Sequence, residues 1–274
     1  MTTTISLRRG PFLYSLPMAT EGAPAGWLDD YYRRGHGQLE KIGILLLHGF
    51  TGSPASMRPW ADFLSENGCT VRVPRIPGHG TRWQDLNQVT WNEWTEKASL
   101  EFEKLKNECS HVFIFGLSMG GANTLYTAAH KPGQVSGIVL VNPMIHIKDP
   151  AIHFIELIKH LVAKRPSVGD DIKKPRTTEW GYDALPTKGV AQLNRLLKAT
   201  RAVLPAISIP TLLFHSVEDH VLPVSNTEII MDEIGSADKR RIELENSFHV
   251  ATLDFDAEFI FQKSLEFVRS QIIL

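Results

Sequence analysis

The sequence predicts an α/β domain with a mostly parallel central sheet, helices on both faces of the sheet and a small helical cap insertion. Between residues 42 and 141, short apolar runs alternate with longer amphipathic segments, as in parallel strands joined by helices. The alternation stops over residues 143–208, where no strong strand pattern is present, and resumes at Thr211. An insertion of this size between two strands predicts a cap over the strand ends.

The composition is typical of one large globular domain. Of the 274 residues, 43% are hydrophobic and 22% charged, and the net charge is -1, so we expect a sizeable core and no binding to nucleic acid. The two cysteines, Cys69 and Cys109, match no metal-binding pattern; we expect reduced core thiols, no metal site and no cofactor. Without a signal-like or membrane-length apolar run, we expect a cytoplasmic protein with no stable membrane insertion. These features leave the oligomeric state open.

The elements are expected in a simple order. Residues 1–40 carry prolines and glycines without periodicity, which predicts an irregular entry segment with a short edge strand at residues 12–15. The run Ile42–Leu47 is apolar throughout, as in a strand buried on both faces. Further strands are expected at residues 70–73, 112–115, 135–141, 211–215 and 241–244. Helices are expected from an N-cap at Ser56 to Gly68, over residues 90–107, 122–130, 152–162, 190–204 and 225–234, and from residue 256 onward.

A Gly-x-Ser-x-Gly pattern, Gly116 to Gly120, lies between the strand at 112–115 and the helix at 122–130. Glycines at both flanking positions permit a turn too tight for side chains, and such a turn lifts the serine hydroxyl clear of the sheet at a helix N-terminus. The pattern alone also occurs in glycine-rich turns with a solvated serine. Its place between a strand and a helix makes Ser118 the candidate nucleophile.

A serine hydroxyl needs a general base, and the base needs a carboxylate to orient it. On this architecture the chain order is serine, acid, histidine. Eleven histidines are present, and His249 alone lies in the loop after the last predicted strand, which makes it the candidate base. Asp219 follows the strand at 211–215 and is the candidate acid, with the adjacent Glu218 left open as an alternative.

Acyl transfer also needs donors for a developing oxyanion. The expected donors are the backbone N–H of Met119, the residue after the serine, and that of Phe50 in the loop after the first buried strand. The ring of Phe50 is also a candidate for the wall of an acyl pocket. Four other histidines near these loops are expected to be structural: His48, His79, His215 and His220. For His79, a contact with the substrate is left open.

From about residue 42 to the C-terminus, the sequence resembles the bacterial monoacylglycerol lipases and small carboxylesterases of the α/β-hydrolase superfamily. The resemblance rests on HGFTGSP (48–54), MRPWA (57–61), PRIPGHGT (74–81), GLSMGG (116–121), EDHVLP (218–223) and NSFHVATLD (246–254). It implies an α/β-hydrolase core with a cap, and we assign residues 1–143 and 209–274 to the core and residues 144–208 to the cap. It also implies a nucleophile, acid and base at Ser118, Asp219 and His249, with oxyanion donors at Phe50 and Met119.

The resemblance further implies a cap glutamate that reads a glycerol head group. Glu179 is the candidate, and a solvated surface glutamate is the alternative. Apolar residues of the helix at 152–162, beginning with Ile152, are expected to line an acyl tunnel, with ordinary core packing as the alternative.

The implied activity is cofactor-free hydrolysis of monoacylglycerols or other esters of short to medium acyl chain, and the expected partner is a small lipid or ester. A general carboxylesterase, a triacylglycerol lipase and a non-catalytic binding protein on the same fold remain open.

Overall fold

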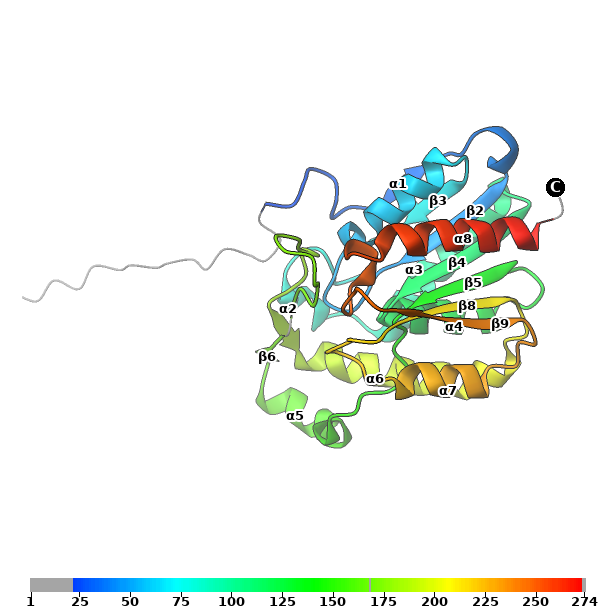
Figure 1. Cartoon of the computed structure of the whole chain (residues 1–274). Helices are drawn as coiled ribbons and strands as arrows, with labels where there is room; N and C mark the ends of the chain where they lie inside the picture. Colours follow the sequence, from blue (N-terminus) through cyan, green and yellow to red (C-terminus); the bar gives the residue numbers. More distant parts are fainter. Residues whose placement is uncertain (1–21, 168, 273–274) are drawn as a thin grey trace, which may run out of the picture.

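The computed structural model describes residues 22–167 and 169–272, and a central seven-stranded sheet organises them (Figure 1). Its strands are β1 (Tyr31–Arg33), β2 (Ile42–Leu47), β3 (Thr70–Val73), β4 (His111–Leu117), β5 (Gly137–Val141), β8 (Thr211–Ser216) and β9 (Lys239–Leu244). They lie in the order β1-β3-β2-β4-β5-β8-β9. Every neighbouring pair is parallel except β1 with β3. The loops that follow the parallel strands therefore meet at one edge of the sheet.

Alternation along the inner strands divides the core between the two faces of the sheet. In β2, Ile44 and Leu46 belong to one hydrophobic cluster, whereas Leu45 and Leu47 belong to the other. The strands β4, β5 and β8 alternate in the same way, because successive side chains of a strand point to opposite faces. Burial on both faces explains why these strands are continuous apolar runs in the sequence.

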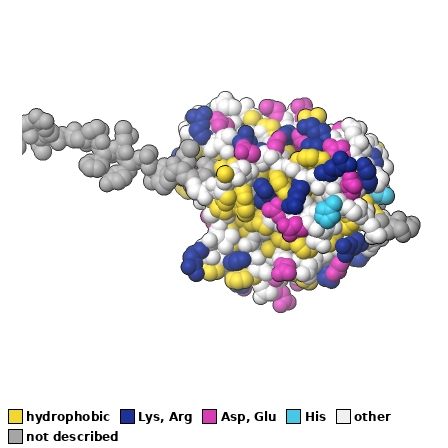
Figure 2. Space-filling model, turned by 90° about the horizontal axis from the view of Figure 1, so that it is seen from above, with side chains coloured by type: hydrophobic (Ala, Val, Ile, Leu, Met, Phe, Trp, Pro, Cys, Tyr) yellow, Lys and Arg dark blue, Asp and Glu magenta, His cyan; other side chains and the backbone are white. Residues whose placement is uncertain are grey.

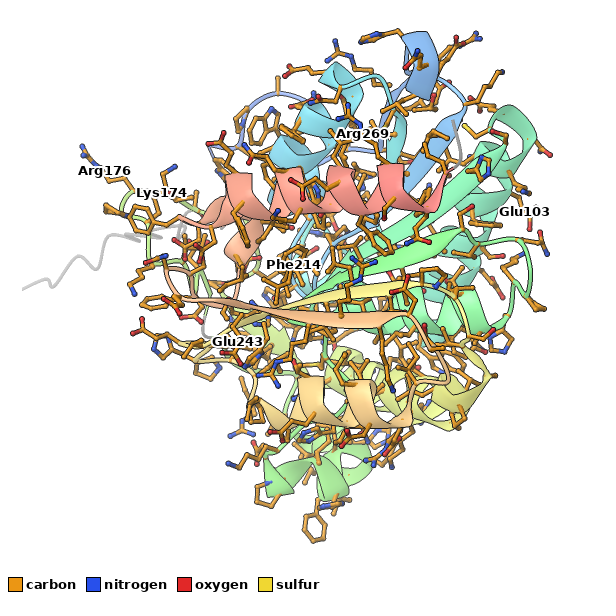
Figure 3. The ribbon with its side chains drawn as sticks, turned by 45° about the vertical axis from the view of Figure 1, so that its right-hand side comes forward. Glu103, Lys174, Arg176, Phe214, Glu243 and Arg269 are labelled. Carbon is orange, nitrogen blue, oxygen red and sulfur yellow. The ribbon has the colours of Figure 1, made fainter. Side chains whose placement is uncertain are left out.

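Helices cover both faces of the sheet, as predicted. They are α1 (Arg58–Glu66), α2 (Trp83–Leu86), α3 (Trp91–Glu108), α4 (Met119–Ala129), α5 (Ile155–Leu161), α6 (Thr187–Val203), α7 (Ser225–Glu233) and α8 (Ala257–Gln271). Short 3-10 helices lie at Gly37–Leu39, Pro54–Met57, Pro150–Phe154, Leu204–Ala206 and Ala251–Leu253. Helices α1 and α8 pack on one face, and α3, α4 and α7 on the other. Figure 3 shows Phe214 of β8 in the interior near α8.

The start of the first long helix differs from the prediction. The N-cap predicted at Ser56 is wrong, because Pro54–Met57 forms a 3-10 turn and α1 begins only at Arg58. Ser53 caps this turn, and its Oγ accepts a hydrogen bond from the N–H of Ala55 at 3.3 Å. Proline fixes φ at the first position of a helical turn, so a 3-10 turn starts at Pro54, upstream of Ser56, and the α-helix starts downstream of it. Helix α3 begins with a capping box, in which the carboxylate of Glu93 accepts from the N–H of Thr90 at 2.8 Å.

The segment inserted between β5 and β8 contains strands that the sequence did not predict. The strands β6 (Lys164–Pro166) and β7 (Ala184–Pro186) pair antiparallel. Three residues are too few to show a period of two, and both strands end in proline. The helix expected at 152–162 is instead the 3-10 turn Pro150–Phe154 followed by α5. Helix α6 packs on α4 of the core, and the cap boundary at residues 144–208 stays a prediction.

The chain before β2 is anchored to the core through β1. Tyr31 pairs with Val73 of β3. Its hydroxyl donates to Asp62 Oδ1 at 2.8 Å, and the guanidinium of Arg58 lies 3.7 Å from its ring centroid. The edge strand predicted at residues 12–15 lies outside the described residues. Both cysteines are free and buried, as predicted.

Charges of both signs are mixed on the face shown in Figure 2, with hydrophobic side chains between them. This mixture agrees with the net charge of -1 for the whole chain. Within the described part of the chain, none of the helices is both long and apolar enough to cross a membrane.

Trp60 joins α1 to the sheet and to α8, and its removal should destabilise the fold. Its fully buried ring lies 5.0 Å from that of Phe115 and 5.9 Å from that of Phe261. We expect Trp60→Ala to lower the free energy of unfolding by about 3–5 kcal/mol through the cavity it leaves, measured by urea denaturation. The control is Leu100→Ala on α3, where the side chain is 55% exposed. This variant should change the free energy of unfolding by less than about 0.5 kcal/mol. Equal losses in the two variants would contradict this packing role.

Candidate active site

Ser118 occupies a sharp turn between β4 and α4. Its φ of 55° and ψ of -118° are strained for a residue with a side chain. A Cβ at Gly116 would lie 2.3 Å from the carbonyl oxygen of Gly120, and a Cβ at Gly120 would lie 2.0 Å from that of Leu47. Both positions therefore require glycine, as predicted. Helix α4 begins at Met119 rather than at residue 122, so its N-terminus directly follows the serine.

Asp219 and His249 come together from the loops after β8 and β9. His249 Nδ1 lies 2.8 Å from Asp219 Oδ2, and the two side chains are 8% and 2% exposed, respectively. Because an ionised carboxylate only accepts hydrogen bonds, Nδ1 carries the proton and Nε2 keeps a lone pair. Asp219 Oδ1 accepts from the N–H groups of Val221 and Leu222, both at 2.8 Å. These bonds hold the carboxylate in one orientation.

The alternative acid, Glu218, points elsewhere. Its carboxylate pairs with Lys173 at 2.6 Å, and its side chain is 52% exposed. Of the two neighbouring acids, Asp219 is therefore the one that contacts the imidazole.

The carboxylate of Asp219 offsets the effect of burial on the pKa of His249. Burial lowers the pKa of His249, but the hydrogen bond and charge of Asp219 outweigh burial and leave this pKa above its usual value. Burial raises the pKa of Asp219, but the hydrogen bond and charge of His249 and two backbone donors leave it below its usual value. A histidine in this setting accepts a proton more readily than one in water.

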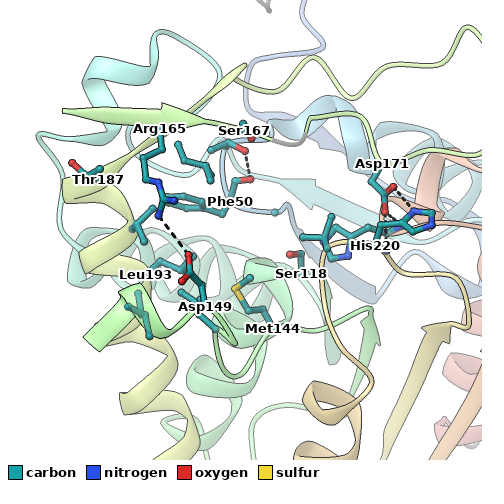
Figure 4. A pocket seen from close by; sticks show the side chains of 18 of the residues that line it. Phe50, Ser118, Met144, Asp149, Arg165, Ser167, Asp171, Thr187, Leu193 and His220 are labelled. Atoms are coloured by element: carbon teal, nitrogen blue, oxygen red, sulfur yellow. Dashed lines mark hydrogen bonds and ion pairs between the residues drawn. The ribbon is translucent and has the colours of Figure 1, made fainter. Parts of the chain in front are cut away.

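Ser118 and His249 line one cavity of about 330 Å³ (Figure 4). Gly49, Thr51 and Glu179 also line it. Much of the remaining wall is apolar and comes from the inserted segment: Met144, Ile147, Ile152, Ile155, Ile158, Leu185, Val190 and Leu193. The structure thus places Ile152 in the cavity wall, where it also packs in a small cluster with Ile155 and Ala191.

The two expected oxyanion donors flank the serine. A Cβ at Gly49 would lie 3.4 Å from Ser118 Cβ, so the loop that carries Phe50 runs beside the nucleophile. Met119 is the first residue of α4, where N–H groups have no partner within the helix. Within the described ranges, neither Phe50 nor Met119 donates its N–H to a backbone acceptor outside its own element. The ring of Phe50 lines the cavity, but the oxyanion role stays a prediction.

Glu179 lies in the cavity wall rather than on the open surface. Its backbone N–H donates to Asp170 Oδ1 at 2.7 Å. Burial, followed by the negative charge of Asp170, raises the pKa of Glu179 to about 7. The solvated-surface alternative therefore does not describe this residue, and head-group reading stays a prediction.

His48 and His79 are buried structural residues. His48 Nε2 accepts from the N–H of Ile76 at 3.1 Å, and burial lowers its pKa to about 4. His79 Nδ1 donates to the carbonyl of Pro77 at 3.1 Å, and burial lowers its pKa to about 3. His79 does not line the cavity, which favours its turn role. His215 and His220 hydrogen-bond to Thr227 and Asp171, respectively, as local partners.

Asn142 was not predicted as a site residue, yet it holds the base loop, which follows β9 and carries His249. Asn142 directly follows β5 and has a φ of 42°. Its amide group donates to the carbonyl of His249 at 2.8 Å and to Ser216 Oγ at 2.9 Å, and its oxygen accepts from the N–H of Ser216 at 2.7 Å. Asparagine tolerates positive φ better than most residues. The signal that could have revealed this role is an asparagine placed directly after a buried strand.

Over residues 22–167 and 169–272, no group of three or more His, Cys, Asp or Glu side chains is arranged to hold a metal ion.

Comparisons with known proteins identify the relatives of this chain. A family model described as serine aminopeptidase, S33, matches residues 40–180 and 170–256. A thermostable monoacylglycerol lipase of Bacillus sp. (strain H-257) is 43% identical over 229 residues, which cover 82% of this chain and 90% of that protein. A carboxylesterase of Bacillus subtilis (strain 168) is 27% identical, with coverages of 82% and 91%. A structure from work on two metagenome-derived lipolytic enzymes, LipS and LipT, has a TM-score of 0.85 at 36% identity and covers 89% of this chain and 98% of its own.

The raised pKa of His249 should depend on Asp219 and not on Glu218. We expect Asp219→Asn to lower this pKa, because the variant removes the hydrogen-bonded negative charge that opposes burial. An NMR titration of the imidazole measures the change. Glu218→Gln is the matched control and should leave the pKa of His249 unchanged. A similar fall in both variants would show that general negative charge, rather than the Asp219 contact, sets the value.

Proposed function

Because the chain belongs to the serine aminopeptidase S33 family of α/β-hydrolases and is a carboxylic ester hydrolase, we propose that it cleaves monoacylglycerols or related esters of short to medium acyl chain. The sequence-based predictions of the α/β-hydrolase fold and of the lipase and carboxylesterase family are confirmed. The observation that carries the proposal is the single cavity in which Ser118 and His249 face an apolar wall and Glu179. A partly buried carboxyl group beside an apolar wall suits a substrate with hydroxyls at one end and an acyl chain at the other.

In the proposed reaction, Ser118 Oγ attacks the ester carbonyl while Nε2 of His249 takes its proton. Asp219 holds Nδ1–H and stabilises the imidazolium. The N–H groups of Phe50 and Met119 bind the oxyanion of the tetrahedral intermediate. His249 then gives the proton to the leaving alcohol, and water attacks the acyl-enzyme by the reverse sequence.

The two parts of the substrate are proposed to bind different parts of the cavity. The acyl chain lies against the isoleucines at 152, 155 and 158, whose burial supplies apolar contact area. The glycerol hydroxyls bind the carboxyl group of Glu179. With a pKa of about 7, this group is present near neutral pH both as a donor and as a pure acceptor.

Two other substrate classes remain as alternatives. A general carboxylesterase would accept methyl and glycerol esters alike, and a triacylglycerol lipase would prefer fully esterified glycerol. The family description names a peptidase, whereas the relatives at 43% and 36% identity are lipolytic enzymes. The apolar cavity wall favours an acyl chain over a peptide.

A fluorophosphonate probe tests the proposed nucleophile. We expect it to label the native protein and Ser110→Ala, a variant at an exposed serine, but not Ser118→Ala. Ester hydrolysis by Ser118→Ala should fall at least about 10⁴-fold, because the covalent route is lost. Labelling of Ser118→Ala at the native rate would contradict the assignment of Ser118 as the nucleophile.

A substrate panel that varies head group and acyl length separately tests the two binding regions. Glu179→Ala should lower kcat/KM for a monoacylglycerol by about 10- to 100-fold, because hydrogen bonds to a charged group are lost. The methyl ester of the same acid should be affected by less than about threefold, since it lacks the hydroxyls.

Ile152→Trp is the complementary variant in this panel. It should move the preferred acyl length to shorter chains by narrowing the cavity and leave the ratio between glycerol and methyl esters unchanged. Glycerol preference that survives Glu179→Ala would remove Glu179 as the head-group reader. A chain-length profile that Ile152→Trp leaves unchanged would remove the acyl-wall assignment.

A further inference from the structure

We propose that Asp171 is a positioning residue of this active site. Its buried carboxylate, which belongs to the inserted segment, binds the backbone of two loops: the base loop and the loop after β8 that carries Asp219, called the acid loop here. The inference rests on the proposed roles of His249 and Asp219. It concerns what keeps those two residues at their hydrogen-bonding distance.

The contacts of Asp171 join three segments that are far apart in the sequence. Asp171 Oδ2 accepts from the N–H of His249 at 3.1 Å and from that of His220 at 3.3 Å. Its Oδ1 accepts from His220 Nδ1 at 2.9 Å (Figure 4). The carbonyl of Asp171 accepts from the N–H of Val250 at 3.1 Å. The carboxylate thus bonds the proposed base itself and the residue next to the proposed acid.

Because Asp171 is buried, the loss of its contacts is expected to be costly. The side chain of Asp171 is only 9% exposed. Removing the carboxylate would leave the N–H groups of His249 and His220 without this acceptor beside the reacting groups. The imidazole of His220 supports the carboxylate from the solvent side and packs edge-on against Phe248 at 4.4 Å. Phe248 belongs to the base loop, so His220 itself reaches from one loop to the other.

A second carboxylate anchors the segment that carries Asp171. Asp254 accepts from the N–H groups of Lys173 and Lys174 at 2.7 and 2.9 Å and from that of Phe248 at 2.9 Å. Figure 3 shows the side chains of Lys174 and Arg176 directed outward. The backbone N–H groups of Lys173 and Lys174 therefore attach this segment to the base loop in addition to the carboxylate of Asp171.

The same region offers a matched contact that should not matter for catalysis. Lys173 pairs with Glu218 at 2.6 Å, which also connects the inserted segment to the acid loop. Both side chains are partly solvated, and exposed pairs of this kind contribute little. Glu218→Gln therefore removes a connection between the same two segments without touching the backbone of His249 or His220.

A pH profile separates the charge of Asp171 from its geometry. The groups that face His249 are Asp219 from the acid loop and Glu179 and Asp171 from the inserted segment, and the charge of each raises the pKa of His249 against burial. Asp171→Asn keeps an oxygen that can accept from both N–H groups but removes the charge. The pKa of His249 should fall, so the neutral base persists to lower pH and the acidic limb of kcat/KM moves to lower pH.

The experiment compares the native chain, Asp171→Ala, Asp171→Asn and Glu218→Gln on p-nitrophenyl butyrate, an ester without a glycerol head group. Rates are normalised to active sites titrated with a fluorophosphonate. We expect Asp171→Ala to lower kcat by about 10- to 100-fold, because small misplacements of reacting groups have effects of this size. Its KM should stay within about threefold, since Asp171 contributes one polar position to the cavity wall and the apolar wall is unchanged. Asp171→Asn should recover most of kcat, and Glu218→Gln should stay within about twofold of native.

Native kcat in Asp171→Ala would overturn the proposal, as would an equal loss of kcat in Glu218→Gln. If Asp171→Ala does not fold, Asp171→Asn decides: a displaced acidic limb with kcat near native supports the proposal, and an undisplaced limb overturns it. Failure of the proposed function is seen separately, as a native protein that does not hydrolyse the ester or a Ser118→Ala variant that is still labelled.

Discussion

The absence of room for a side chain at the turn around Ser118 is the constraint on which the rest of the site depends. A Cβ at Gly120 would collide with the carbonyl of Leu47 at the end of β2, so the turn and the end of the neighbouring strand are in direct contact. This contact requires β2 and β4 to be parallel neighbours. It also brings the loop after β2, with Gly49 and Phe50, beside the serine. One steric requirement therefore positions both the proposed nucleophile and a proposed oxyanion donor.

The acid and base are positioned differently, because long loops rather than a tight turn deliver them. Their 2.8 Å contact depends on polar groups that bind the loop backbone. Asn142 holds the carbonyl side of His249 from the sheet, and Asp171 holds its N–H from the inserted segment. The backbone of the base is thus bound from two directions, which fixes the imidazole relative to a serine that the sheet fixes independently.

The sequence was informative where local rules decide the structure. Apolar runs, the Gly-x-Ser-x-Gly spacing and the order of Asp219 and His249 predicted the sheet, the turn and the hydrogen-bonded pair. It was less informative where non-local hydrogen bonds decide. The strands β6 and β7 are too short for a readable period. The 3-10 turn that begins at Pro54 delays the start of α1 beyond the N-cap predicted at Ser56. Asp171 lies in a charged, proline-interrupted stretch that reads as surface, because nothing local reveals that its partners lie 49 and 78 positions away.

These dependencies bear on how the inserted segment can vary. Its apolar wall, from Ile152 to Ile158, borders the cavity without bonding to the acid or base loops, so substitutions there alter the space for a substrate and leave the reacting groups in place. Asp171 and the backbone at Lys173 and Lys174 are bonded to the base loop, so we expect substitutions or insertions there to act on the proposed reaction itself. Glu179 lies between these cases, because its N–H is held by Asp170, the neighbour of Asp171. On the proposed assignments, we therefore expect changes in the first part of the insertion to alter substrate choice alone, and changes in the second part to alter substrate choice and reaction rate together.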